Sequence, residues 1–199
     1  MQRQWDSVIW SDESKFEVCV GDSRSRIIRM PGEEYHTDCL KKKVKFSASV
    51  MVWGCMSSQG VGRLLFIDGT VNAAKYKIIL QEQLLPSIEM IQLPEGGFIF
   101  QQDGAACHTA NTVKSWFEEM NIPVLKWPSS SPDLSPIETL WHQMKKVLRT
   151  SPVRTIPELK QKLQEIWNNF QPEYCKSLVD TMPKRIDAVL KQKGGCTQW

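Results

Sequence analysis

The sequence predicts a single layered domain in which α-helices pack against one β-sheet. Segments rich in β-branched and aromatic residues fill the first half of the chain, and after Asp133 apolar residues recur at the i, i+3, i+4 spacing of helices. A strand–helix–strand unit lies between these parts. With 199 residues, 41% of them hydrophobic, the chain can build one medium-sized core. We therefore expect a mixed α/β or α+β domain with a single sheet.

The expected strands come first. Residues 7–20, SVIWSDESKFEVCV, read as a hairpin or a pair of strands with a polar break at Ser11–Ser14. Residues 31–45 are polar and aperiodic, which predicts an extended loop or arm. The other strand-like segments are SRIIRM at 25–30, FSASVMVWGCMS at 46–57, GRLLFIDG at 62–69, GFIFQQD at 97–103 and VLKW at 124–127.

The expected helices have recognisable starts and ends. Asn72 is a predicted N-cap of a helix that ends before Pro86, and Thr109 of a second helix. Ser135, Pro136 and Glu138 have the spacing of a capping box, as do Thr155 and Glu158. A last helical segment is expected to break near Pro183 and to end at Gly194.

Composition excludes some classes of protein. No apolar run approaches the roughly 20 residues of a membrane span, and the first residues lack the pattern of a signal peptide. The six cysteines form no C-x-x-C pair, which predicts reduced, structural thiols. A net charge of +3 permits nucleic-acid binding without arguing for it. A cytosolic or nuclear protein is expected.

Three acids stand at predicted junctions between elements. Asp12 lies at the polar break of the first strand segment, Asp103 ends an apolar strand, and Glu138 lies one turn into a helix. If the first and fourth strands are neighbours, Asp12 and Asp103 converge at one sheet edge and the helix brings in Glu138. Converging carboxylates repel unless a cation neutralises them, and oxygen ligands select Mg²⁺ or Mn²⁺. Two such ions can promote phosphodiester chemistry.

Each acid also has a purely structural interpretation. Glu138 can complete the capping box, Asp12 can be a turn residue, and Asp103 can cap a strand end. Taken singly, each acid is better explained in this way. The sequence around the acids changes that judgement.

The blocks IWSDESKF, MVWGCMSSQGVGRLLFIDG, FQQDGAACHTA, VLKWPSSSPDLSPIETLWHQMKK and YCKSLV…MPKRI together resemble the catalytic domain of Tc/mariner transposases of the Sleeping Beauty type. The similarity covers nearly the whole chain in the same order. Residues 104–137, thirty-four in all, separate Asp103 from Glu138, which is the family spacing for a DDE site that ends in glutamate.

The resemblance implies a ribonuclease-H-like fold in which Asp12, Asp103 and Glu138 are the catalytic residues and ligate two Mg²⁺ or Mn²⁺ ions. In such enzymes a metal-activated water cleaves DNA at transposon ends, and the freed 3′-hydroxyl attacks target DNA. The expected partners are therefore transposon-end and target DNA and a second copy of the chain in a homodimer, with no membrane and no small-molecule substrate. The expected compartment is the nucleus.

The resemblance extends to further residues. His108 matches the family histidine five residues after the second aspartate, and is expected to contact DNA or orient a ligand. Residues 31–45 correspond to the family's clamp-like arm, which makes Lys41, Lys42 and Lys43 candidates for contact with DNA phosphate or a partner subunit. We expect one catalytic domain over residues 1–199, with C-terminal helices at 151–199 and without the family's N-terminal helix-turn-helix domains.

Two other functions fit parts of the sequence. A transposase-derived module that binds DNA or dimerises without catalysis is consistent with the expected absence of helix-turn-helix domains. A nuclease for RNA–DNA hybrids would share the metal chemistry, but the sequence blocks match transposases much more extensively. The intact acids favour a metal-dependent DNA transposase.

Overall fold

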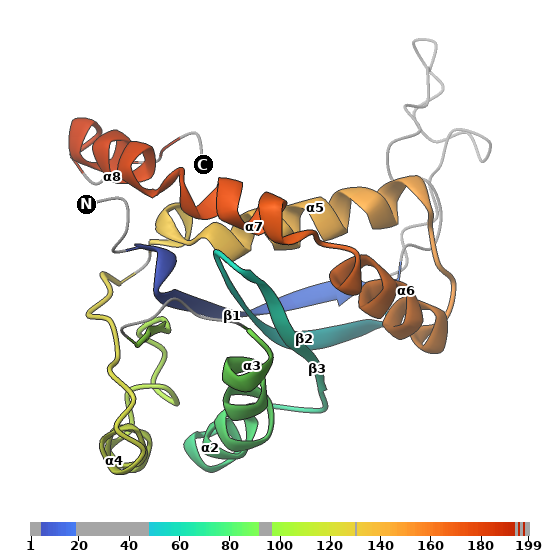
Figure 1. Ribbon diagram of the computed structural model, residues 1–199. Helices are drawn as coiled ribbons and strands as arrows, with labels where there is room; N and C mark the ends of the chain where they lie inside the picture. The colour runs from blue at the N-terminus through green and yellow to red at the C-terminus, as the bar shows by residue number, and fades with distance from the viewer. Residues whose placement is uncertain are drawn as a thin grey trace, which may run out of the picture.

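A four-stranded mixed sheet forms the centre of the molecule (Figure 1). The structure, a computed structural model, describes residues 5–18, 48–91, 97–129, 131–193, 195 and 197. The strands are β1 (Val8–Glu17), β2 (Ser49–Ser57), β3 (Gly60–Ile67) and β4 (Ile99–Gln101). Their order is β3-β2-β1-β4, in which β1–β2 and β2–β3 are antiparallel and β1–β4 are parallel. This arrangement confirms the single sheet and the neighbouring first and fourth strands.

The first strand is continuous, so the predicted break at Ser11–Ser14 is wrong. All ten residues of β1 are extended, and from Trp10 to Glu17 they pair without interruption with β2. Polar side chains in β1 can find hydrogen-bond partners on neighbouring strands. The Ser11 hydroxyl, for example, donates to the carbonyl of Gln101 on β4 at 2.8 Å. Asp12 therefore lies within a rigid strand and not in a turn.

Two layers of helices cover the two faces of the sheet (Figure 1). One layer comprises α5 (Pro136–Thr150), α6 (Ile156–Asn168), α7 (Pro172–Val179) and α8 (Met182–Lys191). The other comprises α2 (Ala73–Ile79), the π-helical turn η2 (Leu80–Leu84), α3 (Leu85–Met90) and α4 (Asn111–Glu119). A 3₁₀ turn, η3 (Pro132–Leu134), leads into α5.

Several predicted helix signals are confirmed. Asn72 Oδ1 accepts from the amide of Lys75 at 2.9 Å, as an N-cap does, and Thr155 Oγ1 accepts from the amide of Glu158 at 3.3 Å. The C-terminal helical segment is interrupted between α7 and α8, close to the expected position at Pro183.

Three local predictions are wrong. The helix from Asn72 does not end before Pro86, because the π turn η2 carries the chain into α3 with that proline in its first turn, where a missing N–H costs least. Thr109 does not cap α4, since its hydroxyl donates to the carbonyl of Ala105. The segment VLKW forms only a single bridge, between Val124 and Phe100.

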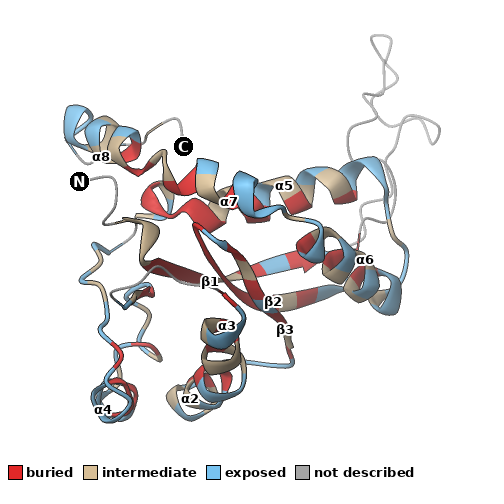
Figure 2. Cartoon of the chain, in the orientation of Figure 1, coloured by how far each residue is buried: buried red, intermediate tan, exposed pale blue. Residues whose placement is uncertain are grey.

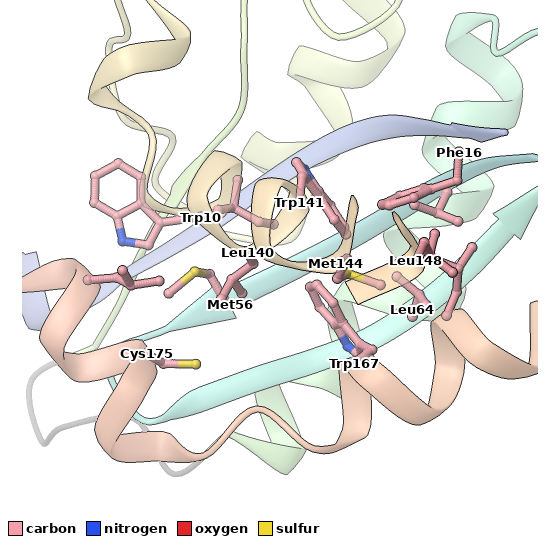
Figure 3. Packing of buried hydrophobic residues seen from close by; sticks show 14 of the residues in the cluster. Trp10, Phe16, Met56, Leu64, Leu140, Trp141, Met144, Leu148, Trp167 and Cys175 are labelled. Carbon is pink, nitrogen blue, oxygen red and sulfur yellow. The ribbon is translucent and has the colours of Figure 1, made fainter. Parts of the chain in front are cut away.

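Each face of the sheet carries its own hydrophobic core, and buried residues concentrate along the strands and on the inner sides of the helices (Figure 2). In the core beneath α5–α7, the indoles of Trp141 and Trp167 stack at a centroid distance of 5.0 Å (Figure 3). Gly54 of β2 provides their space: a Cβ there would lie 2.9 Å from both rings. These two aromatic residues fix α5 and α6 on the sheet.

Some predictions fall on residues outside the described ranges, namely the strand at 25–30, the arm at 31–45 and the helix end at Gly194. Among the helices that the structure describes, none is both long enough and apolar enough to span a bilayer. Cys55, Cys107 and Cys175 are free thiols, and Cys55 and Cys175 are buried.

Candidate active site

The parallel pairing of β1 and β4 brings Asp12 and Asp103 to the same place. Trp10 is paired with Gln101, so the register continued by two residues sets Asp12 opposite Asp103, just past the end of β4. Both carboxylates line a cleft of about 290 Å³, and Glu138 lines it as well. The remaining wall comes mainly from the loop before α5; the cleft is lined by Ser11, Asp12, Gln101, Asp103, Gly104, Ala105, Trp127, Pro128, Ser129, Ser131, Pro132, Ser135 and Glu138.

Trp141, about one turn after Glu138 on helix α5, holds the helix so that Glu138 faces the cleft. Residues three apart lie on the same helix face, and Trp141 from this face donates its indole N–H to Asp12 Oδ2 at 3.0 Å. Trp141 is fully buried against Trp167, whose own N–H donates to the carbonyl of Gly62 at 2.8 Å. The aromatic pair therefore fixes both the position of α5 and one oxygen of Asp12.

The helix start does not use the capping box that the spacing suggests. Ser135 is the N-cap residue and Pro136 occupies the first turn, but the Ser135 side chain makes no capping hydrogen bond. The amide of Glu138 donates instead to the carbonyl of Ser135 at 3.3 Å. The Ser135 amide donates to the carbonyl of Pro132 at 3.0 Å and not to Glu138, so the Glu138 side chain is available to the cleft.

A buried arginine ties the loop before α5 to the C-terminal helix. The guanidinium of Arg185, on α8, donates to the carbonyl of Asp133 and to the hydroxyls of Thr139 and Thr181, each at 2.8 Å. Arg185 is only 1% exposed. The segment MPKRI thus has a structural task, because its arginine holds the segment SPDLSPIE, which carries Glu138.

The electrostatics of the cleft favour a cation. Burial raises the pKa of Asp12 to about 7, with further contributions from the charges of Glu138 and Glu13 that outweigh the hydrogen bonds it accepts. Burial also raises the pKa of Glu138, against the opposing effect of Lys145. Two neighbouring carboxyl groups that resist ionisation are stabilised in their charged form by a bound positive charge.

Asp103 has a different environment. Its Oδ1 accepts from the Nδ1 side of His108 at 2.5 Å and from the amide of Ala105 at 3.0 Å. The hydrogen bond from His108 lowers the pKa of Asp103 and outweighs the effect of burial. Asp103 is therefore ionised and already oriented.

The donor set suits a divalent ion. Besides the three carboxylates, two buried polar atoms that line the cleft, Gln101 Oε1 and Ser135 Oγ, have no hydrogen-bond partner among the described residues. Oxygen donors without partners are what a hydrated Mg²⁺ or Mn²⁺ ion uses. No three Asp, Glu, His or Cys side chains in the described ranges are close enough together to enclose one ion by themselves. The cleft thus offers oxygen ligands without a closed cage.

The structure adds residues that the sequence analysis missed. Glu13 directly follows Asp12 in β1, so its side chain lies on the opposite face of the strand. There its Oε1 is 3.2 Å from His108 Nε2. The available signal was a second acid inside an apolar strand, since such a charge needs a partner when buried. His108 is 3% exposed and contacts Asp103. Lys41, Lys42 and Lys43 lie outside the described residues, so their predicted role stays a prediction.

Comparison with known proteins points to one family. A family model described as DDE superfamily endonuclease matches residues 7–160. The Tc1 transposase of Caenorhabditis elegans is 34% identical over 199 residues, which cover 100% of this chain and 72% of that protein. The Tcb1 transposase of Caenorhabditis briggsae is also 34% identical, over 99% of this chain and 72% of its own length.

Solved structures of the Mos1 mariner transposase have the same fold. The Mos1 paired-end complex with Mn superposes with a TM-score of 0.82 at 24% identity, over 98% of this chain and 57% of the Mos1 chain. The isolated Mos1 catalytic domain superposes with a TM-score of 0.69 at 20% identity, over 98% and 85% of the two chains. The chain thus spans little more than half of the longer Mos1 chains, and the ribonuclease-H-like fold expected from the sequence is confirmed. Fold, family model and relatives agree: the chain belongs to the DDE superfamily endonucleases and, among them, to the Tc1/mariner transposases, whose catalytic domain it matches.

Proposed function

We propose that this chain cuts and joins DNA phosphodiesters as the catalytic domain of a cut-and-paste transposase, with Asp12, Asp103 and Glu138 as its metal ligands. The observation that carries the proposal is the shared cleft of these three acids, which come from a strand, a strand end and a helix far apart in sequence. In an endonuclease family, to which the chain belongs, three acids that meet in one cleft can bind the metal ions that cleave DNA. Their shared cleft also supports catalysis over the non-catalytic module.

The proposed reaction has two steps that conserve atoms. Water adds to a phosphorus atom at a transposon end, the 3′ oxygen leaves, and a free 3′-hydroxyl and a 5′-phosphate result. That hydroxyl then adds to a target phosphorus, and the target's 3′ oxygen leaves. One phosphodiester forms for each one broken in the second step, so joining needs no nucleotide cofactor.

The chain's own residues supply the platform for these steps. Asp12, fixed by Trp141, and Asp103, fixed by His108, would hold two divalent ions together with Glu138. When bound, the ions would supply the positive charge that activates an attacking oxygen and stabilises a leaving one. The Mos1 complexes that resemble this chain are described with Mn or with Mg, and as paired-end and strand-transfer complexes. We accordingly propose DNA ends and target as substrates, a second copy as partner, and the nucleus as the compartment.

The test is Mn²⁺-dependent nicking of supercoiled plasmid by the purified chain and by Glu138→Gln. The variant keeps the shape of the side chain but loses its charge, and nicking should fall by at least about a hundredfold, because metal-ion catalysis contributes several kcal/mol to the barrier. Glu173→Gln is the matched control, since this exposed glutamate lies in the first turn of α7, beside Pro172. A folded Glu138→Gln that nicks as fast as the control would refute the assignment.

A further inference from the structure

Asp103 needs support that the sheet does not give it. It lies two residues after the last residue of β4, and its side chain is 53% exposed. A carboxylate on such a loop position would normally rotate between several orientations. Here the Ala105 amide and His108 both donate to Oδ1. No described residue donates to Oδ2, so that oxygen is available to the cleft.

Contacts with Tyr76 and Gln102 hold His108 in place. Its ring lies on Tyr76 of α2, with a centroid distance of 3.9 Å. Its carbonyl accepts from Gln102 Nε2 at 3.2 Å, and the Tyr76 hydroxyl donates to Gln102 Oε1 at 2.8 Å. Because the ring stacks and the main chain is tied, the imidazole has one orientation. That orientation points Nδ1 at Asp103.

The remaining ring nitrogen faces Glu13. The distance between His108 Nε2 and Glu13 Oε1 is 3.2 Å, and the two side chains are 4% and 19% exposed. Glu13 Oε1 is buried and has no aligned hydrogen-bond donor within the described residues, so His108 Nε2 is the polar group that the structure sets against it. The ring therefore lies between the two carboxylates, with Nδ1 on Asp103 and Nε2 facing Glu13.

We infer that Glu13 and His108 are positioning residues, which hold the Asp103 carboxylate with Oδ1 occupied and Oδ2 presented to the metal-binding cleft. The inference rests on the proposed function, because it assigns a task toward the ions that Asp103 would bind. Strand β1 then serves the site from both faces: Asp12 enters the cleft directly, and Glu13 acts on Asp103 through His108 from the other layer.

The prediction is that Glu13→Gln weakens Mn²⁺ binding about 10- to 100-fold, the usual effect of removing a group that orients a ligand. Calorimetric titration of the full chain with Mn²⁺ measures this. Glu17→Gln is the matched control, since it removes an exposed carboxylate four residues further along the same strand, and it should bind as the wild type does. If Glu13→Gln fails to fold, Glu13→Asp replaces it: this shorter acid keeps the charge but not the reach, and should also weaken binding.

A second readout needs no metal. The Nδ1 proton of His108, held in a short hydrogen bond, should give a far-downfield NMR signal that is lost in Glu13→Gln, kept in Glu17→Gln and assigned by its absence from His108→Asn. Loss of thermal stability alone would not produce this pattern. Wild-type binding equal to that of Asp103→Asn would reject the proposed function. An Asp103-dependent affinity that Glu13→Gln and Glu13→Asp leave unchanged would reject the positioning role alone.

Discussion

Asp12→Asn is expected to stabilise the metal-free protein, and to do so more strongly as the pH rises. Burial and the neighbouring acids raise the pKa of Asp12 from 3.8 to about 7. Between these values the folded chain holds a proton that the unfolded chain has released, so stability falls as the pH rises through this window and is constant above it. Asparagine has no proton to release and can still accept the Trp141 hydrogen bond.

The size of the effect follows from the pKa difference. Each unit corresponds to about 1.4 kcal/mol, so the full shift corresponds to about 4 kcal/mol of lost stability above pH 7. At pH 5 less than half of this loss is present. The stability advantage of Asp12→Asn should therefore grow by up to about 3 kcal/mol between pH 5 and pH 8.

Urea unfolding in EDTA at several pH values measures this difference. Asp187→Asn, at an exposed position of α8, is the control for the loss of a carboxylate outside the cleft. If the difference between Asp12→Asn and the wild type does not change with pH, Asp12 is ionised at little cost, and the reasoning that the cleft calls for a cation fails.

Three further changes test the framework around the cleft. Gly54→Ala places a Cβ 2.9 Å from the Trp141 ring and should cost about 1 to 3 kcal/mol in urea unfolding; a neutral effect would mean that the indoles can shift freely. Trp141→Phe removes the N–H donor to Asp12 and should cost about 1 kcal/mol. Because that bond lowers the pKa of Asp12, the pH dependence of stability should extend to higher pH, and an unchanged profile would contradict the contact. Arg185→Met breaks the bond to the Asp133 carbonyl and should cost about 3 kcal/mol and reduce plasmid nicking as well, whereas Arg185→Lys should retain part of both; equal stability of Arg185→Met and wild type would show that the loop needs no anchor.

The meeting of the three acids in one cleft could be anticipated from the sequence, because their positions follow from regular elements and from the segments that resemble the family. The parallel pairing of β1 and β4 and the helix that begins at Pro136 determine where Asp12, Asp103 and Glu138 lie. The break expected at Ser11–Ser14 was wrong because polar residues in a strand resemble a turn until their partners are known. Here the partner of Ser11 is ninety residues away, at Gln101. Such compensation is tertiary and leaves no local signal.

The same reason explains why the sequence does not indicate that Glu13 belongs to the site. The two faces of a strand in the middle of a sheet contact different helical layers, so successive residues lie in unrelated surroundings. In the sequence, however, adjacent acids such as Asp12 and Glu13 look like one polar patch. The role of Glu13 depends on His108, and the role of His108 depends on Tyr76 from α2. None of these spacings is periodic.

Gly54 is the residue that lets helix α5 pack closely against the sheet at the site. It is paired with Asp12 across β1 and β2, and its missing side chain lets the Trp141 ring lie close against the sheet. Only from that position does the indole N–H reach Asp12, while Asp103 is held from the opposite layer by His108. The two aspartates therefore depend on different helices for their orientation. Loosening α5 should disturb Asp12 and Glu138 together and leave the His108–Asp103 bond intact, so Gly54→Ala should weaken Mn²⁺ binding while the downfield His108 signal persists.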